Sequence, residues 1–137
     1  MGLTLTRILG FRATHHYRLP GRTAEENRAR FGDLTEPHPH DYTCAVTVGG
    51  APDPASGMLL DLPTLDRILA DEVGGLDGRD LNAAIPPFAT CAVQPTCEAL
   101  AAWLFARIAP RLPAGARLHR VRVAEGPSLY ADCTADD

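Results

Sequence analysis

The sequence of 137 residues contains no lysine, so all 13 of its basic residues are arginine. Schiff-base enzymes, pyridoxal enzymes and phosphate-loop nucleotide-binding proteins each use a lysine amine, so these classes are excluded. Acidic residues outnumber basic ones, 17 to 13, which gives a net charge of −4. Nucleic-acid-binding domains normally present a basic face, so we expect no nucleic-acid partner.

Long hydrophobic runs are also missing. No stretch approaches the ~18 apolar residues of a membrane span, and arginines interrupt the first residues, where a secretion signal would have an apolar core. We therefore expect no membrane partner and a cytoplasmic location. The four cysteines form no CxxC pair, which favours reduced thiols over a structural zinc knuckle. The length and the 45% hydrophobic content predict one domain over residues 1–137.

Hydrophobic periodicity predicts an α+β domain, with antiparallel strands and helices on one face of the sheet. The predicted strands are Leu3–Ala13, Asp41–Gly49, Leu118–Ala124 and Leu129–Cys133. The predicted helices begin at Asp61 and Thr96 and end by Gly74 and Pro110. The polar segments 17–33 and 76–94 are interpreted as connections, the first with one helical turn.

The clearest chemical feature is the pair His38 and His40, directly before the second predicted strand. In an extended backbone, residues two apart project to the same side, and Pro39 favours that backbone. Two imidazoles on one face are half of a metal site, and a third ligand would complete a catalytic zinc centre with an open position. The candidates are His15 and His16 at the end of the first strand, and strand parity favours His15. The alternative is that these are ordinary loop histidines.

Six segments of the sequence carry a resemblance to one family. They are Phe11–His15 (FRATH, compared with F-x-A-x-H), His38–Tyr42 (HPHDY, H-G-H-N-Y), Gly57–Leu62 (GMLLDL, G-M-V-x-D-F), Leu76–Asn82 (LDGRDLN, L-D-H-x-x-L-N), Pro95–Glu98 (PTCE, P-T-S-E) and Val123–Glu125 (VAE, V-x-E-T). In this order, they resemble the 6-pyruvoyl-tetrahydropterin synthase and 6-carboxytetrahydropterin synthase family. Each motif alone is weak, but six in the right order over nearly the whole chain are highly specific.

The resemblance implies a tunnelling fold, in which a four-stranded antiparallel sheet carries two helices on one face and subunits close a barrel. It implies a homo-oligomer, trimer or hexamer, with active sites at the subunit interfaces. It also implies that His15, His38 and His40 hold Zn²⁺ and that Glu125 anchors a pterin ring. A carboxylate can accept two parallel hydrogen bonds from the N–H groups of a pterin. The alternative for Glu125 is a surface glutamate at a strand terminus.

The resemblance also places two residues at the start of the second helix against the same ring. Thr96 and Cys97 would contribute hydroxyl, thiol or backbone contacts to the substrate. For Thr96 the alternative is a helix N-cap, because threonine hydroxyls commonly accept a hydrogen bond from the first turn of a helix.

Two positions depart from the family pattern. The family's catalytic cysteine, four residues before the first histidine of H-G-H, is Leu34 here, and the histidine of the L-D-H loop is Gly78. General acid–base groups contribute about 10²–10⁴-fold each, so other residues must move the proton. We predict Glu36 and Asp77 as these catalytic residues, with a solvated loop glutamate as the alternative for Glu36. Lesser candidates are Asp41, Tyr17 and His16.

The resulting functional hypothesis is a zinc-dependent lyase or synthase that acts on a small molecule, dihydroneopterin triphosphate or a related heterocycle. One alternative is a family member recruited to a different cyclisation, isomerisation or aldol-type reaction in specialised metabolism. A second alternative is a non-catalytic pterin- or metal-binding subunit.

Overall fold

The computed structural model describes residues 2–136, so Met1 and Asp137, the ends of the predicted domain, lie outside the described residues. The strands are β1 (Leu3–His15), β2 (His38–Gly50), β3 (Arg79–Asp80), β4 (Ala116–Gly126) and β5 (Leu129–Thr134). The α-helices are α1 (Ala24–Phe31), α2 (Leu62–Glu72), α3 (Leu81–Ala84), α4 (Pro86–Ala89) and α5 (Cys97–Ile108). Short 3-10 helices are η1 (Gly32–Thr35), η2 (Gly74–Leu76) and η3 (Ala109–Arg111).

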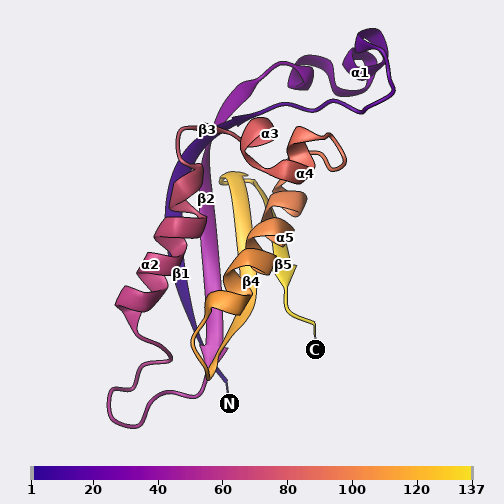
Figure 1. The fold of residues 1–137 in the computed structure, drawn as a ribbon. Helices are drawn as coiled ribbons and strands as arrows, with labels where there is room; N and C mark the ends of the chain where they lie inside the picture. The colour runs from indigo at the N-terminus through magenta and orange to yellow at the C-terminus, as the bar shows by residue number, and fades with distance from the viewer. Residues whose placement is uncertain (1, 137) are drawn as a thin grey trace.

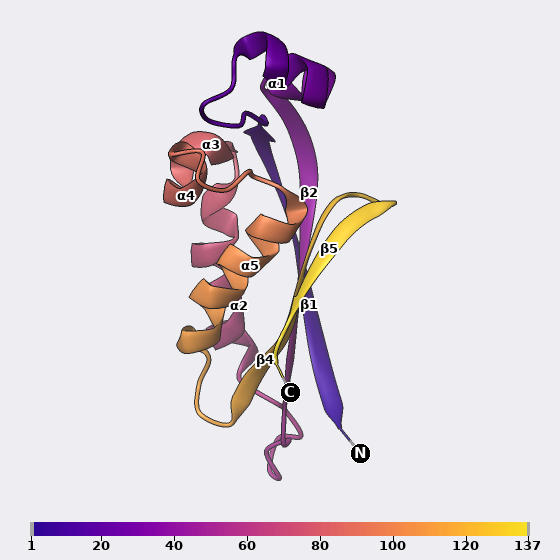
Figure 2. The same ribbon diagram turned by 90° about the vertical axis from the view of Figure 1, so that its right-hand side faces the viewer.

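One sheet with strand order β3-β1-β2-β4-β5 carries α2 and α5 on a single face, which gives a two-layer molecule (Figures 1 and 2). The four long strands pair antiparallel, so the predicted α+β class is confirmed. The two-residue strand β3 pairs parallel with β1, opposite Ala13 and Thr14, and adds a fifth strand to the four predicted. Two residues are too short for hydrophobic alternation to show, so the sequence pattern contains no signal for β3.

Strands β1 and β2 form a long antiparallel ribbon that runs from Leu3 opposite Gly50 to His15 opposite His38. Both strands extend further than predicted, because the histidine and proline residues at this end interrupt the apolar alternation without interrupting the pairing. The register is important for the site: it brings the end of β1 directly against the start of β2.

The core lies between the sheet and the helices. The alternate residues of β2 and β4 that face the helices are fully buried: Tyr42, Cys44, Val46, Val48, Val121 and Val123. They pack with the buried side chains of α2 and α5, Leu65, Ile68, Leu69, Leu100, Leu104 and Ile108. Burial of apolar area contributes about 25 cal/mol per Å², so this layer is the main source of stability.

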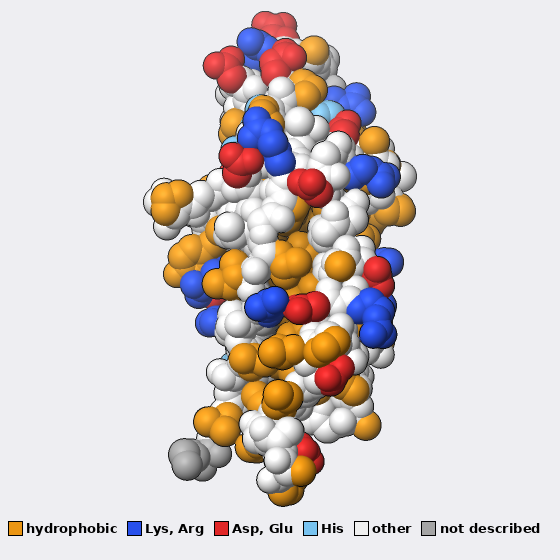
Figure 3. Space-filling model, turned by 90° about the vertical axis from the view of Figure 1, so that its left-hand side faces the viewer, with side chains coloured by type: hydrophobic (Ala, Val, Ile, Leu, Met, Phe, Trp, Pro, Cys, Tyr) orange, Lys and Arg blue, Asp and Glu red, His pale blue; other side chains and the backbone are white. Residues whose placement is uncertain are grey.

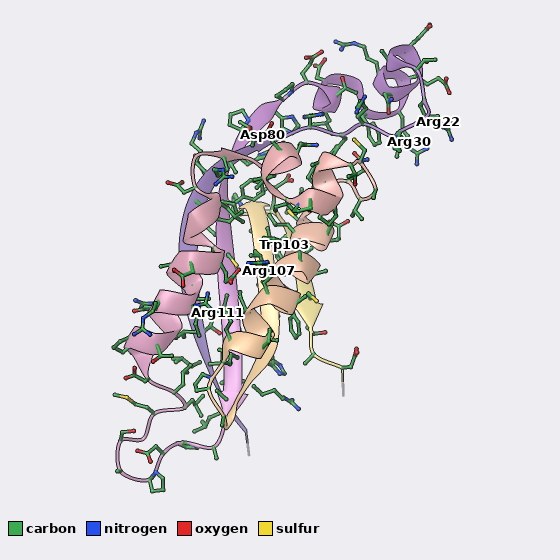
Figure 4. All side chains as sticks on the ribbon, in the orientation of Figure 1. Arg22, Arg30, Asp80, Trp103, Arg107 and Arg111 are labelled. Carbon is green, nitrogen blue, oxygen red and sulfur yellow. The ribbon has the colours of Figure 1, made fainter. Side chains whose placement is uncertain are left out.

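Helices α2 and α5 are also connected by charged side chains. Arg107 Nε donates to Glu72 Oε2 at 2.6 Å, and Arg111 donates to Glu72 and to Asp71. Arg107 also lies over the Trp103 ring, 4.9 Å from its centroid, and Figure 4 shows these side chains on α5. Exposed ion pairs contribute roughly 0–1 kcal/mol each, so they orient the two helices more than they hold them together.

Residues 19–36, here called the arm, connect β1 to β2 and project beyond the end of the sheet (Figures 1 and 2). The sequence predicted one helical turn there, but α1 has eight residues and begins with a capping box between Thr23 and Glu26. The arm is fixed internally by the buried Asn27, whose amide bonds to the backbone of Leu19 and Thr23. Charged side chains gather at this tip in Figure 3.

Segment 76–94, predicted as a connection, begins with the last residue of η2 and then contains the short elements β3, α3 and α4. Asp80 caps α3 by accepting a hydrogen bond from Asn82 N at 3.0 Å, and the apolar side chains of Leu81, Ile85 and Phe88 are buried. Elements of four residues or fewer show no helical periodicity, so the pattern could not predict them. Among residues 2–136, no helix is long and apolar enough to cross a membrane.

Candidate active site

Three imidazoles meet on the helix side of the sheet, at the end of the β1–β2 ribbon. His15 lies opposite His38 in the antiparallel register, and His40 lies two residues further along the same face of β2. One potential ligand atom from each ring lies within 4.8 Å of the others. The ring centroids are 4.5 Å apart for His15 and His38, 4.9 Å for His15 and His40, and 5.0 Å for His38 and His40. The predicted three-histidine group is thus brought together.

Backbone carbonyls orient two of these rings. His15 Nδ1 donates to the Pro95 carbonyl at 2.7 Å, and His38 Nδ1 donates to the Glu36 carbonyl at 2.8 Å. A proton on Nδ1 leaves the lone pair on Nε2, which is the form that binds a metal; this tautomer follows from the partners. The Nε2 atoms of both rings are buried, and within residues 2–136 neither has a hydrogen-bond partner.

The electrostatic surroundings keep His15 neutral. Burial lowers its pKa from 6.5 to about 4, although the Pro95 hydrogen bond acts in the opposite direction, and His38 and His40 lower the pKa further. A neutral imidazole with an unpaired, buried Nε2 is what a divalent metal ion requires of a histidine ligand. His15 meets both conditions, and His38 shares the buried, unpaired Nε2. Together with His40, whose ring lies close to both, they form a group that could hold a metal ion, and a three-histidine set leaves a coordination position for substrate or water.

Glu125 lies directly beside the three histidines. Its Oε1 is 3.7 Å from His15 Nε2 and its Oε2 is 3.8 Å from His40 Nε2, with 13% of the side chain exposed. The register of β4 and β5 shifts between Ala124 and Gly126, so Glu125 is a bulged residue. A bulge of this kind can redirect a side chain, and here Glu125 points toward the histidines.

The first residues of α5 lie against Glu125. Cys97 is 4% exposed, and burial, followed by the Glu125 charge, raises the pKa of its thiol to about 12. Cys97 is therefore a thiol and not a thiolate at neutral pH, which excludes it as a base. Thr96 caps α5, because its hydroxyl accepts a hydrogen bond from Ala99 N at 3.1 Å. The cap leaves the Thr96 hydroxyl proton available for another acceptor.

Two tyrosines flank His15. Tyr42 is 1% exposed, stacks on Phe11 with 4.9 Å between ring centroids, and has its hydroxyl 3.2 Å from His15 Nδ1. Tyr17 packs edge-on against His15, with 5.0 Å between centroids, and is only partly buried. Burial is the main cause that raises the pKa of Tyr17 to about 12, and the charge of Glu125 raises it further.

The two predicted catalytic carboxylates lie apart from the histidines. Glu36 has a side chain that is 69% exposed and pairs with Arg28 at 3.3 Å, on the arm. Asp77 Oδ1 accepts a hydrogen bond from Arg12 N at 2.8 Å, at the outer edge of β1. The structure therefore groups the predicted metal ligands with Glu125 and Cys97, but places neither Glu36 nor Asp77 among them; their catalytic roles stay predictions.

Of the three lesser candidates, Tyr17 lies against His15, whereas His16 and Asp41 are not part of the three-histidine group. The backbone of His16 is clamped by Asn82, which accepts from His16 N at 2.9 Å and donates to His16 O at 3.1 Å. Asp41 pairs with Arg12 at 2.8 Å and is exposed. Leu34, at the position of the family's cysteine, has 45% of its surface exposed.

Sequence analysis missed two supports of the site, the Pro95 carbonyl and the Tyr42 hydroxyl. Both belong to motifs that the sequence analysis singled out, PTCE and HPHDY. A backbone carbonyl has no side-chain signature, so no residue pattern reveals that Pro95 orients His15. The Tyr42 contact follows from parity, because Tyr42 shares the face of β2 with His38 and His40.

Comparisons with known proteins agree with this geometry. A sequence profile described as "6-pyruvoyl tetrahydropterin synthase" matches residues 4–136. The chain belongs to the 6-pyruvoyl tetrahydropterin synthase family. It is 33% identical over 124 residues to the human 6-pyruvoyl tetrahydrobiopterin synthase, covering 88% of this chain and 83% of the human one. The solved Caenorhabditis elegans 6-pyruvoyl tetrahydropterin synthase superimposes with a TM-score of 0.89 at 25% identity, covering 99% of this chain and 97% of that chain.

A more distant similarity connects the chain to a differently named enzyme. The dihydroneopterin monophosphate aldolase of Pyrococcus furiosus is 31% identical over 91 residues, covering 66% of this chain and 72% of that one. Members of the 6-pyruvoyl tetrahydropterin synthase family are oligomeric lyases of tetrahydropterin biosynthesis that bind a metal ion and act on small molecules. The three-histidine group of this chain could hold such an ion.

Proposed function

We propose that this protein is a zinc-dependent, tetrahydropterin synthase-like lyase that acts on dihydroneopterin triphosphate or a closely related heterocycle. The observation that supports the proposal most strongly is the position of Glu125, 3.7 Å from His15 Nε2 and 3.8 Å from His40 Nε2. A metal-ligating group and a carboxylate suited to a pterin thus share one small, largely buried space.

The proposed metal ligands are the Nε2 atoms of His15, His38 and His40. Zn²⁺ bound there would act as a Lewis acid and polarise an oxygen on the substrate side chain. The chain's own contribution is to keep His15 neutral by burial and to orient two of the rings, because the carbonyls of Pro95 and Glu36 accept the Nδ1 protons of His15 and His38.

The proposed ring anchor is Glu125. Its carboxylate would accept two parallel hydrogen bonds from the amino group and ring N–H of a pterin, a geometry that water cannot reproduce in a closed site. Thr96 and Cys97 at the start of α5 would contact the same ring, Thr96 through its free hydroxyl proton and Cys97 through its protonated thiol.

Proton transfer is proposed for Glu36 and Asp77. Glu36 is two residues from His38 and would reach the substrate by exchanging its exposed pair with Arg28 for a contact above the histidines. Asp77 lies at the outer edge of β1, so it would serve an active site only where a second copy of the chain packs along that edge.

The proposed assembly is a homotrimer or hexamer whose subunits close a barrel. Two sheet edges support this proposal: within residues 2–136, β5 has a single neighbouring strand, and β3 covers β1 only at Ala13 and Thr14. Hydrophobic side chains gather below the arm on the side formed by α2 and the edge of β1 (Figure 3). A cytoplasmic location is also proposed, in line with four free thiols: Cys44, Cys91, Cys97 and Cys133.

The direct test is to incubate the zinc-loaded protein with dihydroneopterin triphosphate and to identify the products by mass spectrometry. Release of triphosphate with a pyruvoyl product indicates the pyruvoyl branch, and release of triphosphate with acetaldehyde indicates the carboxy branch. The Glu125→Gln variant keeps the shape of the side chain and removes its charge, and we expect it to lose turnover at least 10²-fold with its zinc content unchanged. A zinc-loaded protein that leaves the substrate intact would refute the proposed reaction.

The role of Glu36 has a matched control on the arm. Arg28 pairs with both Glu36 and Asp33, at 3.3 and 3.5 Å, and both carboxylates are exposed. If Glu36 moves the proton, Glu36→Gln lowers kcat by about 10²–10⁴-fold, whereas Asp33→Asn leaves it nearly unchanged. Equal rates in the two variants would assign Glu36 to the surface of the arm.

A further inference from the structure

Tyr17 and Tyr42 lie on either side of His15, but only one hydroxyl is used by the fold. The Tyr42 hydroxyl is buried and reaches His15 Nδ1 at 3.2 Å. The Tyr17 side chain is partly buried, and within residues 2–136 its hydroxyl makes no hydrogen bond. A partly buried phenol with an unpaired hydroxyl beside a ligand-binding site is available to a ligand.

The position of the Tyr17 ring is well defined. It packs edge-on against His15, 5.0 Å between centroids, and its centroid is 6.4 Å from that of His38. Its other side meets Phe31 at the end of α1, with 5.7 Å between centroids. The ring therefore forms a wall between the three histidines and the arm.

The backbone on both sides of this ring is held. Tyr17 N donates to the Leu34 carbonyl at 2.9 Å, which attaches it to the arm. The next residue, Arg18, exchanges two hydrogen bonds of 2.8 Å with the Gln94 side chain, just before Pro95. Tyr17 is thus fixed between the arm and the segment that orients His15, and a preorganised donor loses little entropy when a ligand binds.

The surroundings of Tyr17 determine what it can recognise. Tyr17 packs against His15, with 5.0 Å between ring centroids, and Glu125 Oε1 lies 3.7 Å from His15 Nε2, so the phenol borders the space of the proposed ring anchor. Glu125 is an acceptor and selects N–H groups of a ligand. A neutral phenol supplies the complementary donor, whereas Leu34 has an apolar side chain and Gly78 has no side chain to donate from.

We propose that the Tyr17 hydroxyl donates a hydrogen bond to an oxygen on the C6 side chain of the heterocyclic substrate, and so selects side chains that carry hydroxyl or carbonyl groups. The inference rests on the proposed function, since it takes a pterin held by Glu125 as the ligand. Tyr17 is then a substrate-contacting residue that acts beside the metal ligands and independently of them. A ligand that lacks the oxygen leaves this donor unpaired and binds less well.

The test uses two fluorescent probes that differ only in the side chain: neopterin, with its hydroxylated C6 side chain, and unsubstituted pterin. Their affinities are measured for the zinc-loaded wild type, Tyr17→Phe and Tyr42→Phe. We expect Tyr17→Phe to bind neopterin about 3- to 10-fold more weakly and pterin within about 2-fold of wild type. Tyr42→Phe removes the same atom from the other side of His15, and we expect it to keep the wild-type ratio of the two affinities. Zinc content and thermal midpoint are recorded for all three proteins.

The outcomes separate this inference from the proposed function. If the wild type binds both probes and Tyr17→Phe weakens neopterin alone, the hydrogen bond is supported. If Tyr17→Phe leaves both affinities unchanged, or weakens both equally, the inference is wrong and the proposed function stands. If the wild type binds neither probe, the pterin site itself is refuted, and the inference with it.

Discussion

The helix-covered half of the sheet and its histidine end are built on the same face of the same strands. In the covered half, alternate residues such as Val46 and Val121 are fully buried under α2 and α5. At the histidine end, defined by His15, His38, His40 and Glu125, the same alternation presents nitrogen and oxygen atoms. In the covered half the side chains pack against the helices. At the histidine end, the buried Nε2 atoms of His15 and His38 have no hydrogen-bond partner within residues 2–136. Unpaired buried groups lower stability, so the histidine end is arranged for a ligand and the covered half for folding.

The largest effect that separates the two regions is expected when one proposed metal ligand is removed from the histidine end, because zinc binding should fall while stability does not. Losing a group that only orients a metal ligand weakens metal binding by roughly 10–100-fold, so we expect His38→Ala, which removes a proposed ligand itself, to weaken zinc binding by more than that. The free energy of unfolding of the metal-free protein should change little or increase, since the substitution deletes a buried, unpaired Nε2. Zinc titration and urea unfolding measure the two effects. His119→Ala, an exposed histidine on β4, is the control; equal losses in both variants would contradict a specific site.

A substitution in the covered half should have the opposite effect: it should lower stability and leave zinc affinity nearly unchanged. Leu104 on α5 is fully buried, and Leu104→Ala should lower the free energy of unfolding by about 2–5 kcal/mol through lost burial and a cavity. Zinc affinity of the folded fraction should remain within a few-fold of wild type. Leu129→Ala is the matched control, because that side chain is 56% exposed and should cost less than about 0.5 kcal/mol. Parallel losses of zinc and stability in Leu104→Ala would mean that the two halves act as one unit.

The two halves also differ in how far the sequence could predict them. The alternation of β2 and β4 and the helical spacing of α2 and α5 predicted the covered half, because burial imposes a period on the residues. The histidine end was predicted from parity and from motifs, since an HPHDY segment contains no apolar alternation. The Glu125 bulge and the Pro95 carbonyl depend on backbone geometry, which side-chain identity does not encode.

Hydrophobic periodicity did not predict the helices of the arm and of segment 76–94. Helix α1 has a capping box but almost no apolar stripe, so its polar sequence resembles a loop. The positions of Glu36 and Asp77 were equally beyond prediction, because Glu36 pairs with Arg28 across the arm and Asp77 accepts from the backbone of Arg12, 65 residues away, and neither contact leaves a sequence pattern.

A third prediction concerns pH and the metal-free protein. Burial lowers the pKa of His15 to about 4, against 6.5 in the unfolded chain, so the unfolded state binds the extra proton first as the pH falls. The stability that depends on neutral His15 is therefore complete above pH 6.5 and is lost progressively down to pH 4. The difference between the two pKa values corresponds to about 3 kcal/mol.

Urea unfolding at several pH values measures this loss, with His15→Gln as the comparison. We expect the stability of His15→Gln to depend less steeply on pH between 6.5 and 4, while both proteins share the same carboxylates. Parallel curves for the two proteins would show that His15 is no more buried in solution than in an unfolded chain.

The smallest expected effect lies at the boundary of the two halves, at Thr96. Its hydroxyl oxygen caps α5 by accepting from Ala99 N at 3.1 Å, while its proton remains free to contact the ligand that we propose Glu125 holds. Thr96→Ala should lower the free energy of unfolding by about 1 kcal/mol, and Thr96→Ser should preserve it, because serine supplies the same cap. If Thr96 also contacts substrate, Thr96→Ala weakens pterin binding several-fold and Thr96→Ser does not. If Thr96→Ala loses stability but binds pterin as the wild type does, the residue belongs only to the helix, and the substrate site begins at Cys97.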